Sequence, residues 1–182
     1  VVSGAGDDGS AWIRNNETID LRGGTVTVGD NDNLALIADS AGSVQFDGGA
    51  GGGVAGDDFS IGTGTLRLEA AAGNVEDWNG GGETGDLAVI AGKFILKSGT
   101  TENVYTNVAS IDAAISGTSN LNITETDGLV IEDLDGDNRS MTVANGNIDV
   151  TVSAGNLTIE DAVQALDISN DGTRTGLIDM KV

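Results

Sequence analysis

Apolar and polar residues alternate along short stretches of this chain, and each stretch opens with a small residue. The repeated unit is Gly or Ser, then a polar residue, then apolar, polar and apolar residues. Alternation with a period of two is typical of a β-strand that buries one face. The unit predicts strands at residues 24–28, 42–46, 64–68, 85–89, 119–123, 146–150 and 155–159.

Several copies of this unit recur about 18 to 22 residues apart, close to one coil of a parallel β-helix. Glycine before a strand suits a tight corner, because it adopts backbone conformations that other residues resist. The pattern predicts an all-β fold, a parallel β-helix or solenoid of short strands with Gly-rich corners. The period breaks at Lys93–Gly117 and Gly48–Gly56, where we expect loops or bulged corners, and only Ile111–Ile115 has a helical pattern.

The same strands could form a β-sandwich adhesion domain, because regular turn signals are common to both folds. The predicted strands are very short, aromatic residues make up only 3% of the chain, and no large core residue recurs at a fixed place. These features favour the solenoid. The 29 glycines also suggest disorder, but the hydrophobic fraction is 38% and its residues alternate with polar ones.

One continuous run carries a resemblance to a known family. It is Met141-Thr-Val-Ala-Asn-Gly-Asn-Ile-Asp-Val-Thr-Val-Ser-Ala-Gly-Asn-Leu-Thr-Ile159, with weaker versions at Ser119–Glu132 and Gly64–Glu76. The run resembles the repeats of filamentous-haemagglutinin-type bacterial exoproteins. The resemblance covers about half the chain and implies export, a filamentous right-handed β-helix, and adhesive or matrix roles. It supplies no catalytic residues.

Composition narrows the function. The chain has 29 acidic and 8 basic residues and a formal charge of −21, which argues against nucleic-acid binding and against docking on an anionic membrane. His and Cys are absent, which excludes zinc sites and the Ser-His-Asp and Cys-His mechanisms. No run approaches the about 20 apolar residues of a membrane helix, so we expect no membrane insertion.

Acidic clusters are the most plausible chemical sites. In the segment from Asp133 to Asn138, Asp133, Asp135 and Asp137 alternate around a glycine, as at the start of a calcium loop. The bidentate Glu of an EF-hand is missing, so a solvated turn is the alternative to calcium. The Asp57-Asp58 pair could act on a glycosidic bond, but it lies beside a Gly-rich run and the basic residues are scattered.

Other polar and aromatic residues have two interpretations each. Trp12 and Trp78 could stack on a sugar or anchor a neighbouring subunit, or they could cap the aliphatic core. Four Asn-x-Ser/Thr triplets fit the glycosylation sequon, but Asn side chains stacked between coils explain them equally well. The triplets begin at Asn16, Asn122, Asn138 and Asn156.

We therefore expect no enzyme. Residues 1–182 are predicted to be a single solenoid segment of a longer repeat array or fibre, since both ends are apolar and lack a polar cap. The expected function is a structural or adhesive module of a secreted filament, sheath or giant surface exoprotein. Its partners would be further copies or neighbouring repeats and surface carbohydrate. The alternative is a carbohydrate-binding or polysaccharide-cleaving β-helix.

Overall fold

The computed structural model describes residues 10–22, 32–46, 59–79, 83–85, 87–100, 103–167 and 174–182. Every regular element in these residues is a β-strand, and none is a helix that could cross a membrane. The first strands are β1 (Ser10–Asn15), β2 (Ile19–Asp20), β3 (Asn33–Ala38), β4 (Val44–Phe46), β5 (Phe59–Ser60), β6 (Thr65–Ala70), β7 (Val75–Asn79), β8 (Glu83–Gly85) and β9 (Leu87–Ser98). The later strands are β10 (Asn103–Thr118), β11 (Leu121–Glu125), β12 (Leu129–Ile131), β13 (Met141–Asn145), β14 (Ile148–Val152), β15 (Leu157–Ile159), β16 (Val163–Asp167), β17 (Arg174–Thr175) and β18 (Ile178–Lys181).

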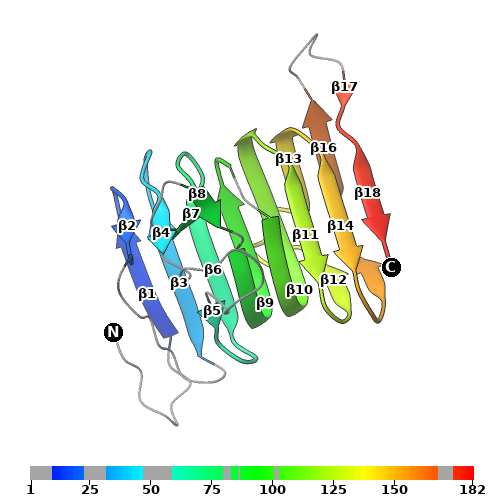
Figure 1. Cartoon of the computed structure of the whole chain (residues 1–182), viewed down its shortest axis with the longest axis horizontal. Coiled ribbons are helices and arrows are strands. Elements are labelled where there is room, and N and C mark those ends of the chain that lie inside the picture. The colour runs from blue at the N-terminus through cyan, green and yellow to red at the C-terminus, as the bar shows by residue number, and fades with distance from the viewer. Residues whose placement is uncertain are drawn as a thin grey trace.

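Nearly all strand pairs are parallel. A 14-stranded sheet follows the order β1-β3-β6-β9-β10-β11-β14-β18, with further strands attached beside this path, and β2, β4, β7 and β8 form a second sheet. Within the described ranges, only β7 with β8 and β16 with β17 pair antiparallel. Figure 1 shows the strands side by side along the long axis, from β1 at one end to β18 at the other. Parallel pairing does not match the antiparallel sheets of a β-sandwich.

Residues of like position pair from strand to strand and form columns. One inward column passes through Ala11, Leu34, Leu66, Phe94, Ile111, Ile131 and Ile159. A second passes through Ile13, Leu36, Leu68, Leu96, Ala113, Met141 and Val163. Because side chains alternate between the faces of a strand, a fixed register keeps every aliphatic residue of a column on the buried face.

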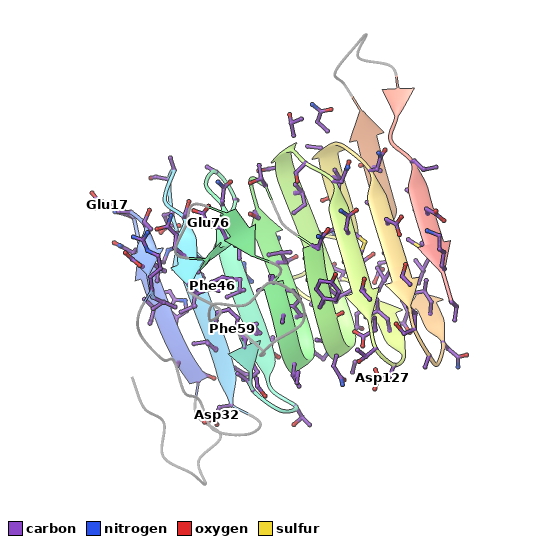
Figure 2. All side chains as sticks on the ribbon, viewed as in Figure 1. Glu17, Asp32, Phe46, Phe59, Glu76 and Asp127 are labelled. Atoms are coloured by element: carbon purple, nitrogen blue, oxygen red, sulfur yellow. The ribbon has the colours of Figure 1, made fainter. Side chains whose placement is uncertain are left out.

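The columns merge into a single hydrophobic core that extends from Ala11 to Ala165. Its members are mostly Leu, Ile, Val and Ala, which suit a pleated surface with little depth to fill. An aromatic contact adds to this core where the rings of Phe46 and Phe59 meet edge to face with centroids 5.1 Å apart (Figure 2). This geometry is a favoured one for aromatic pairs.

The structure confirms most of the predicted strands and corrects two expectations. Strands occupy the predicted apolar positions in β4, β6, β9, β11, β14 and β15, whereas 24–28 and Gly48–Gly56 lie outside the described residues. Lys93–Gly117 was expected to form loops or bulged corners, but it contains the second half of β9 and all of β10 except Thr118. Ile111–Ile115 is not helical: it is part of β10, with Ile111, Ala113 and Ile115 in the core. The alternation is hidden because Ala114, which lies between the inward Ala113 and Ile115, is itself apolar.

The repeat is also less regular than the sequence pattern suggests. The sequence offset between paired residues varies from 17, for Val108 with the Glu125 carboxylate, to 32, for Asn33 with the Thr65 amide. The strands keep their register, so the variation falls in the connections between them. Connections can change length at modest entropic cost, because the loop-closure penalty grows slowly with length.

A column of glycines marks one corner of the stack. The amide of Gly99 donates to the carbonyl of Gly73 at 2.7 Å, and Gly117 donates to Gly99 at 2.8 Å. A Cβ at Gly73 would overlap the carbonyl oxygen of Gly42. Glycine is needed here because the backbone of one strand connection lies directly against the next.

We expect Gly73→Ala to lower the free energy of unfolding by about 1–3 kcal/mol, the usual cost of forcing extra atoms into a packed interior. Gly128→Ala is the matched control, because a Cβ there would meet its nearest atom at 3.5 Å, an ordinary contact. Urea unfolding followed by circular dichroism measures both. Equal losses in the two variants would contradict the close approach at Gly73.

Candidate functional site

The candidate site is built around a strap, residues Glu132–Ser140, that leaves the sheet between β12 and β13. Ile131 pairs with Ile111 of β10, and Met141 pairs with Ala113. Asp112 is the only β10 residue between these two pairs, so the whole strap must emerge opposite one residue. Hydrogen bonds hold both ends: the Glu132 amide donates to the Ile111 carbonyl at 3.2 Å, and the Ala113 amide donates to the Ser140 carbonyl at 3.0 Å.

Asp133 organises the turn within the strap. Its Oδ1 accepts the amides of Asp135, Gly136 and Asp137 at 3.2, 2.6 and 3.2 Å, and its Oδ2 accepts the Asn138 amide at 2.7 Å. Gly136 and Asn138 have φ of 85° and 66°, the left-handed region that Gly and Asn tolerate best. Desolvation works to raise the pKa of Asp133, but the four amide donors outweigh it and lower that pKa.

The carboxylate of Asp112 on β10 holds the strap through a hydrogen bond. Its side chain is buried on the outer face of β10, and its Oδ2 accepts the Leu134 amide at 3.0 Å. Burial raises the pKa of Asp112 from 3.8 to about 6, and the nearby charges of Asp135 and Asp137 add to this effect against Lys97 and the amide. A buried carboxyl of this kind exchanges its proton close to neutral pH.

Lys97 of β9 supplies the opposite charge. Its Nζ is in contact with Asp135 Oδ2 and lies 3.4 Å from Asp137 Oδ2. The Lys97 side chain is 17% exposed and that of Asp135 is 6% exposed, so this ion pair is largely shielded from water. Desolvation works to lower the pKa of Lys97, but the two carboxylates outweigh it and raise that pKa.

The strap therefore crosses β10 and reaches β9. A second contact of the same kind joins Lys93 Nζ to Glu132 Oε1 at 3.6 Å. Ile95 pairs with Asp112 and lies between the core residues Phe94 and Leu96, which places its side chain on the outer face. Ile95 is nevertheless buried. The strap accounts for this burial, because it contacts Lys93 and Lys97, the outward residues on either side of Ile95 in β9.

The three carboxylates predicted as calcium ligands have different roles in this arrangement. Asp133 accepts four backbone amides, whereas Asp135 and Asp137 face the Lys97 ammonium. One carboxylate oxygen each from Asp112, Asp133 and Asp135 lie within 4.8 Å of one another. Calcium at Asp133, Asp135 and Asp137 stays a prediction, and these residues already have a resident cation in Lys97.

Sequence reasoning missed Asp112 and Lys97. Asp112 offered one signal, a carboxylate within an otherwise apolar run, but Lys97 offered none. The Asp57-Asp58 pair, the other acidic site predicted from the sequence, lies outside the described residues.

Glu125, the last residue of β11, is a second buried carboxylate. Its side chain occupies a core position opposite Thr106 and Val152, and its oxygens accept the amides of Val108, Thr126 and Asp127 at 3.1, 2.8 and 3.2 Å. Burial raises the pKa of Glu125 above its ordinary value of 4.5, against the effect of these amides. The carboxylate ties the corner to the neighbouring β10.

The remaining predicted features are partly described. Trp12 lies on the outer face of β1 and is 60% exposed, while the Trp78 side chain lies outside the described residues. The expected Asn contacts between neighbouring strands are present: Asn122 donates to Asn103 Oδ1 at 3.1 Å, and Asn120 Oδ1 accepts the Asn147 amide at 2.9 Å. Of the asparagines that begin the four triplets, Asn122 takes part in these bonds, whereas Asn138 lies in the turn at Asp133.

Comparison with protein-family models, with curated proteins and with solved structures finds no match. The function of the chain is therefore inferred from its fold and from the geometry of the strap.

Glu125 generates a pH-dependence prediction. An acid whose pKa is raised in the folded state favours folding at low pH, and its ionisation costs stability as pH rises above the ordinary pKa of 4.5. We expect the stability of Glu125→Gln relative to the native chain to improve with rising pH above 4.5 and then level off. Urea unfolding from pH 4 to 8 measures it, with the exposed Glu160→Gln as control. A pH-independent difference would contradict this.

Lys97 generates a calcium prediction. Because its ammonium neutralises the strap carboxylates, the melting temperature of the native chain should not respond to calcium or a chelator, whereas calcium should raise that of Lys97→Met. Lys93→Met is the control, since it removes the same charge from an exposed pair. A native chain that gains as much as Lys97→Met would show that calcium binds beside Lys97.

Proposed function

We propose that this chain is a structural or adhesive module of an extracellular bacterial filament, sheath or giant surface exoprotein. In this proposal the parallel strands are coils of a single right-handed β-solenoid spanning residues 1–182. The parallel, in-register columns and the continuous narrow core support the solenoid. The proposed role is non-enzymatic.

The observation that carries the proposal is the solvent exposure of the column residues in the last strands, β15 and β18. Ile131 and Ile148 are fully buried because further strands cover them. Their column neighbours Ile159 and Ile178 are 49% and 41% exposed. Residues that are buried wherever the stack continues are thus open to solvent here, and β18 has an unpaired strand edge among the described strands.

The chemistry of the missing cover follows from the rest of the stack. The strands β11 and β12 are covered by the parallel strands β14 and β15, which place aliphatic residues at the inward positions. A further coil of the same kind, from a neighbouring repeat or a second copy, would bury Ile159 and Ile178 and satisfy the edge of β18. The proposed partners are therefore this chain itself or adjoining repeats.

A second candidate function is binding of a neutral surface carbohydrate, and Trp12 is the observation in its favour. The indole is 60% exposed, and its strand neighbour Arg14 forms two hydrogen bonds to Asp39, at 2.6 and 2.9 Å. An exposed aromatic beside mutually neutralised charges suits an uncharged sugar. Cleavage of a polysaccharide would need a separate site, and Asp57-Asp58 lies outside the described residues.

We expect the chain to associate with rising concentration into elongated particles, visible by sedimentation velocity and electron microscopy. Ile159→Lys should weaken this association at least about tenfold, the effect of roughly 1.4 kcal/mol of lost burial. Thr158→Lys is the matched control, because Thr158 is the preceding residue of β15 and points to the opposite face. A chain that stays monomeric at high concentration would contradict end-to-end assembly, and glycan binding lost in Trp12→Ala would favour the second function.

A further inference from the structure

The stack has a groove at the corner where β5 is followed by β6 and β11 is followed by β12. The long strands β9 and β10 cross this corner without a break, since β9 pairs first with β5 and then with β6, and β10 pairs first with β11 and then with β12. The groove has a volume of about 370 Å³ and is lined by residues 62–63, 90–92, 107–109 and 127–128. Four neighbouring strand positions span roughly 14 Å, so the groove is long and narrow.

Hydrogen bonds fix the backbone on both sides of the groove. The Gly92 amide donates to the Gly64 carbonyl at 2.9 Å, which holds β9 against the connection before β6. On the other side the buried Glu125 accepts the amides of Val108 and Asp127 at 3.1 and 3.2 Å. A ligand therefore meets a groove that is already formed and loses little affinity in ordering it.

Small apolar side chains form most of the groove. Ala91 and Val108 are buried at its base, while Ala109 is exposed beside them. A Cβ at Gly92 would overlap the carbonyl oxygen of Thr63, so no larger side chain can occupy that position. A narrow apolar surface of this length fits an unbranched aliphatic chain, which gains by leaving water.

Asp127 gives the groove its charge. It is the only charged residue among the described residues that line the groove, and it is exposed at the lower edge of the stack in Figure 2. Asn107 adds a carboxamide from the neighbouring β10. The next base along β9, Lys93, is already paired, with its Nζ 3.6 Å from Glu132 Oε1. The formal charge of −21 adds a general attraction for cations.

These features favour one class of ligand. Anions are repelled by Asp127 and by the net charge of the chain. A sugar ring finds no stacking surface, because no aromatic residue is among the described residues that line the groove. A linear aliphatic amine matches both parts of the groove, since its methylene stem can lie on apolar surface while its charged end stays at a carboxylate.

We propose that this groove binds a linear polyamine, with one ammonium against the Asp127 carboxylate and the aliphatic stem lying across β10 and β9. The side-chain oxygen of Asn107 is a second acceptor for the ammonium, which has three N–H donors to place. The inference does not rest on the proposed function, and it holds whether or not the chain forms filaments.

Titration with spermidine, followed by the backbone amide signals of the folded chain in NMR spectra, tests the proposal. We expect saturable shifts at Ala109 and Asp127, with one site and a Kd of about 1 mM or below. The titration is made at about 0.15 M salt, where the Debye length is about 8 Å and distant charges contribute little. A linear diol of similar length should not bind, because it has the aliphatic stem without the charge.

Four variants separate this site from general attraction to an acidic chain. Asp127→Asn should weaken spermidine binding about three- to fivefold, and Asn107→Asp should strengthen it about two- to fivefold, as expected for a single exposed ion pair. Ala109→Phe should weaken binding at least about tenfold while keeping every charge, because the ring fills the groove. Glu160→Gln is the matched control, since it removes an exposed carboxylate from outside the groove and should leave binding unchanged.

Equal weakening in Asp127→Asn and Glu160→Gln would overturn the proposal, because it would show attraction to the net charge alone. Unchanged binding in an Ala109→Phe chain that is folded by circular dichroism would overturn it as well. The same holds if the diol binds as well as spermidine, or if millimolar spermidine gives no saturable shift. Assembly is measured separately by sedimentation, so these results leave the proposed function to its own test.

Discussion

The structure depends on the parallel register of inward aliphatic side chains. Most strands contribute only one to three residues to the core, far too few to be stable alone, and even β9 and β10 contribute five each. Stacking in register adds these small contributions into columns such as Leu34, Leu66 and Phe94, and the columns merge into one core along the whole stack. A slip of one residue would turn a strand's aliphatic residues towards solvent, so register and burial enforce each other.

This constraint explains where the chain tolerates variation. Connections differ in length by many residues, because they lie outside the columns and their closure costs little entropy. The corner at Gly73 is the opposite case, since neighbouring backbones touch there and no side chain fits. The outer surface has charges and hydrogen-bonding groups, such as the Asn122–Asn103 pair, that connect strands without entering the core.

The strap is the one described insertion that turns polar groups into a buried network. Asp112 occupies an outer position that solvent would normally reach, and the strap covers it. Burying a carboxylate is costly unless donors and a counter-charge accompany it. The Leu134 amide and Lys97 fill those roles, although burial still raises the pKa of Asp112 to about 6.

The sequence by itself determined the all-β character of the chain and the inward residues of β4, β6, β11, β14 and β15 and of the start of β9, because period-two alternation is a local property that reads directly from neighbours in the chain. It also indicated that Asp133, Asp135 and Asp137 share one loop. Only the tertiary structure showed that most of Lys93–Gly117 is strand. Its burial pattern departs from simple alternation because the strap also buries Ile95 and Asp112 on the outer face. The same holds for Lys97, which is separated from Asp137 by 40 positions. Parallel stacking brings them together, and local sequence carries no record of which strand will lie beside which.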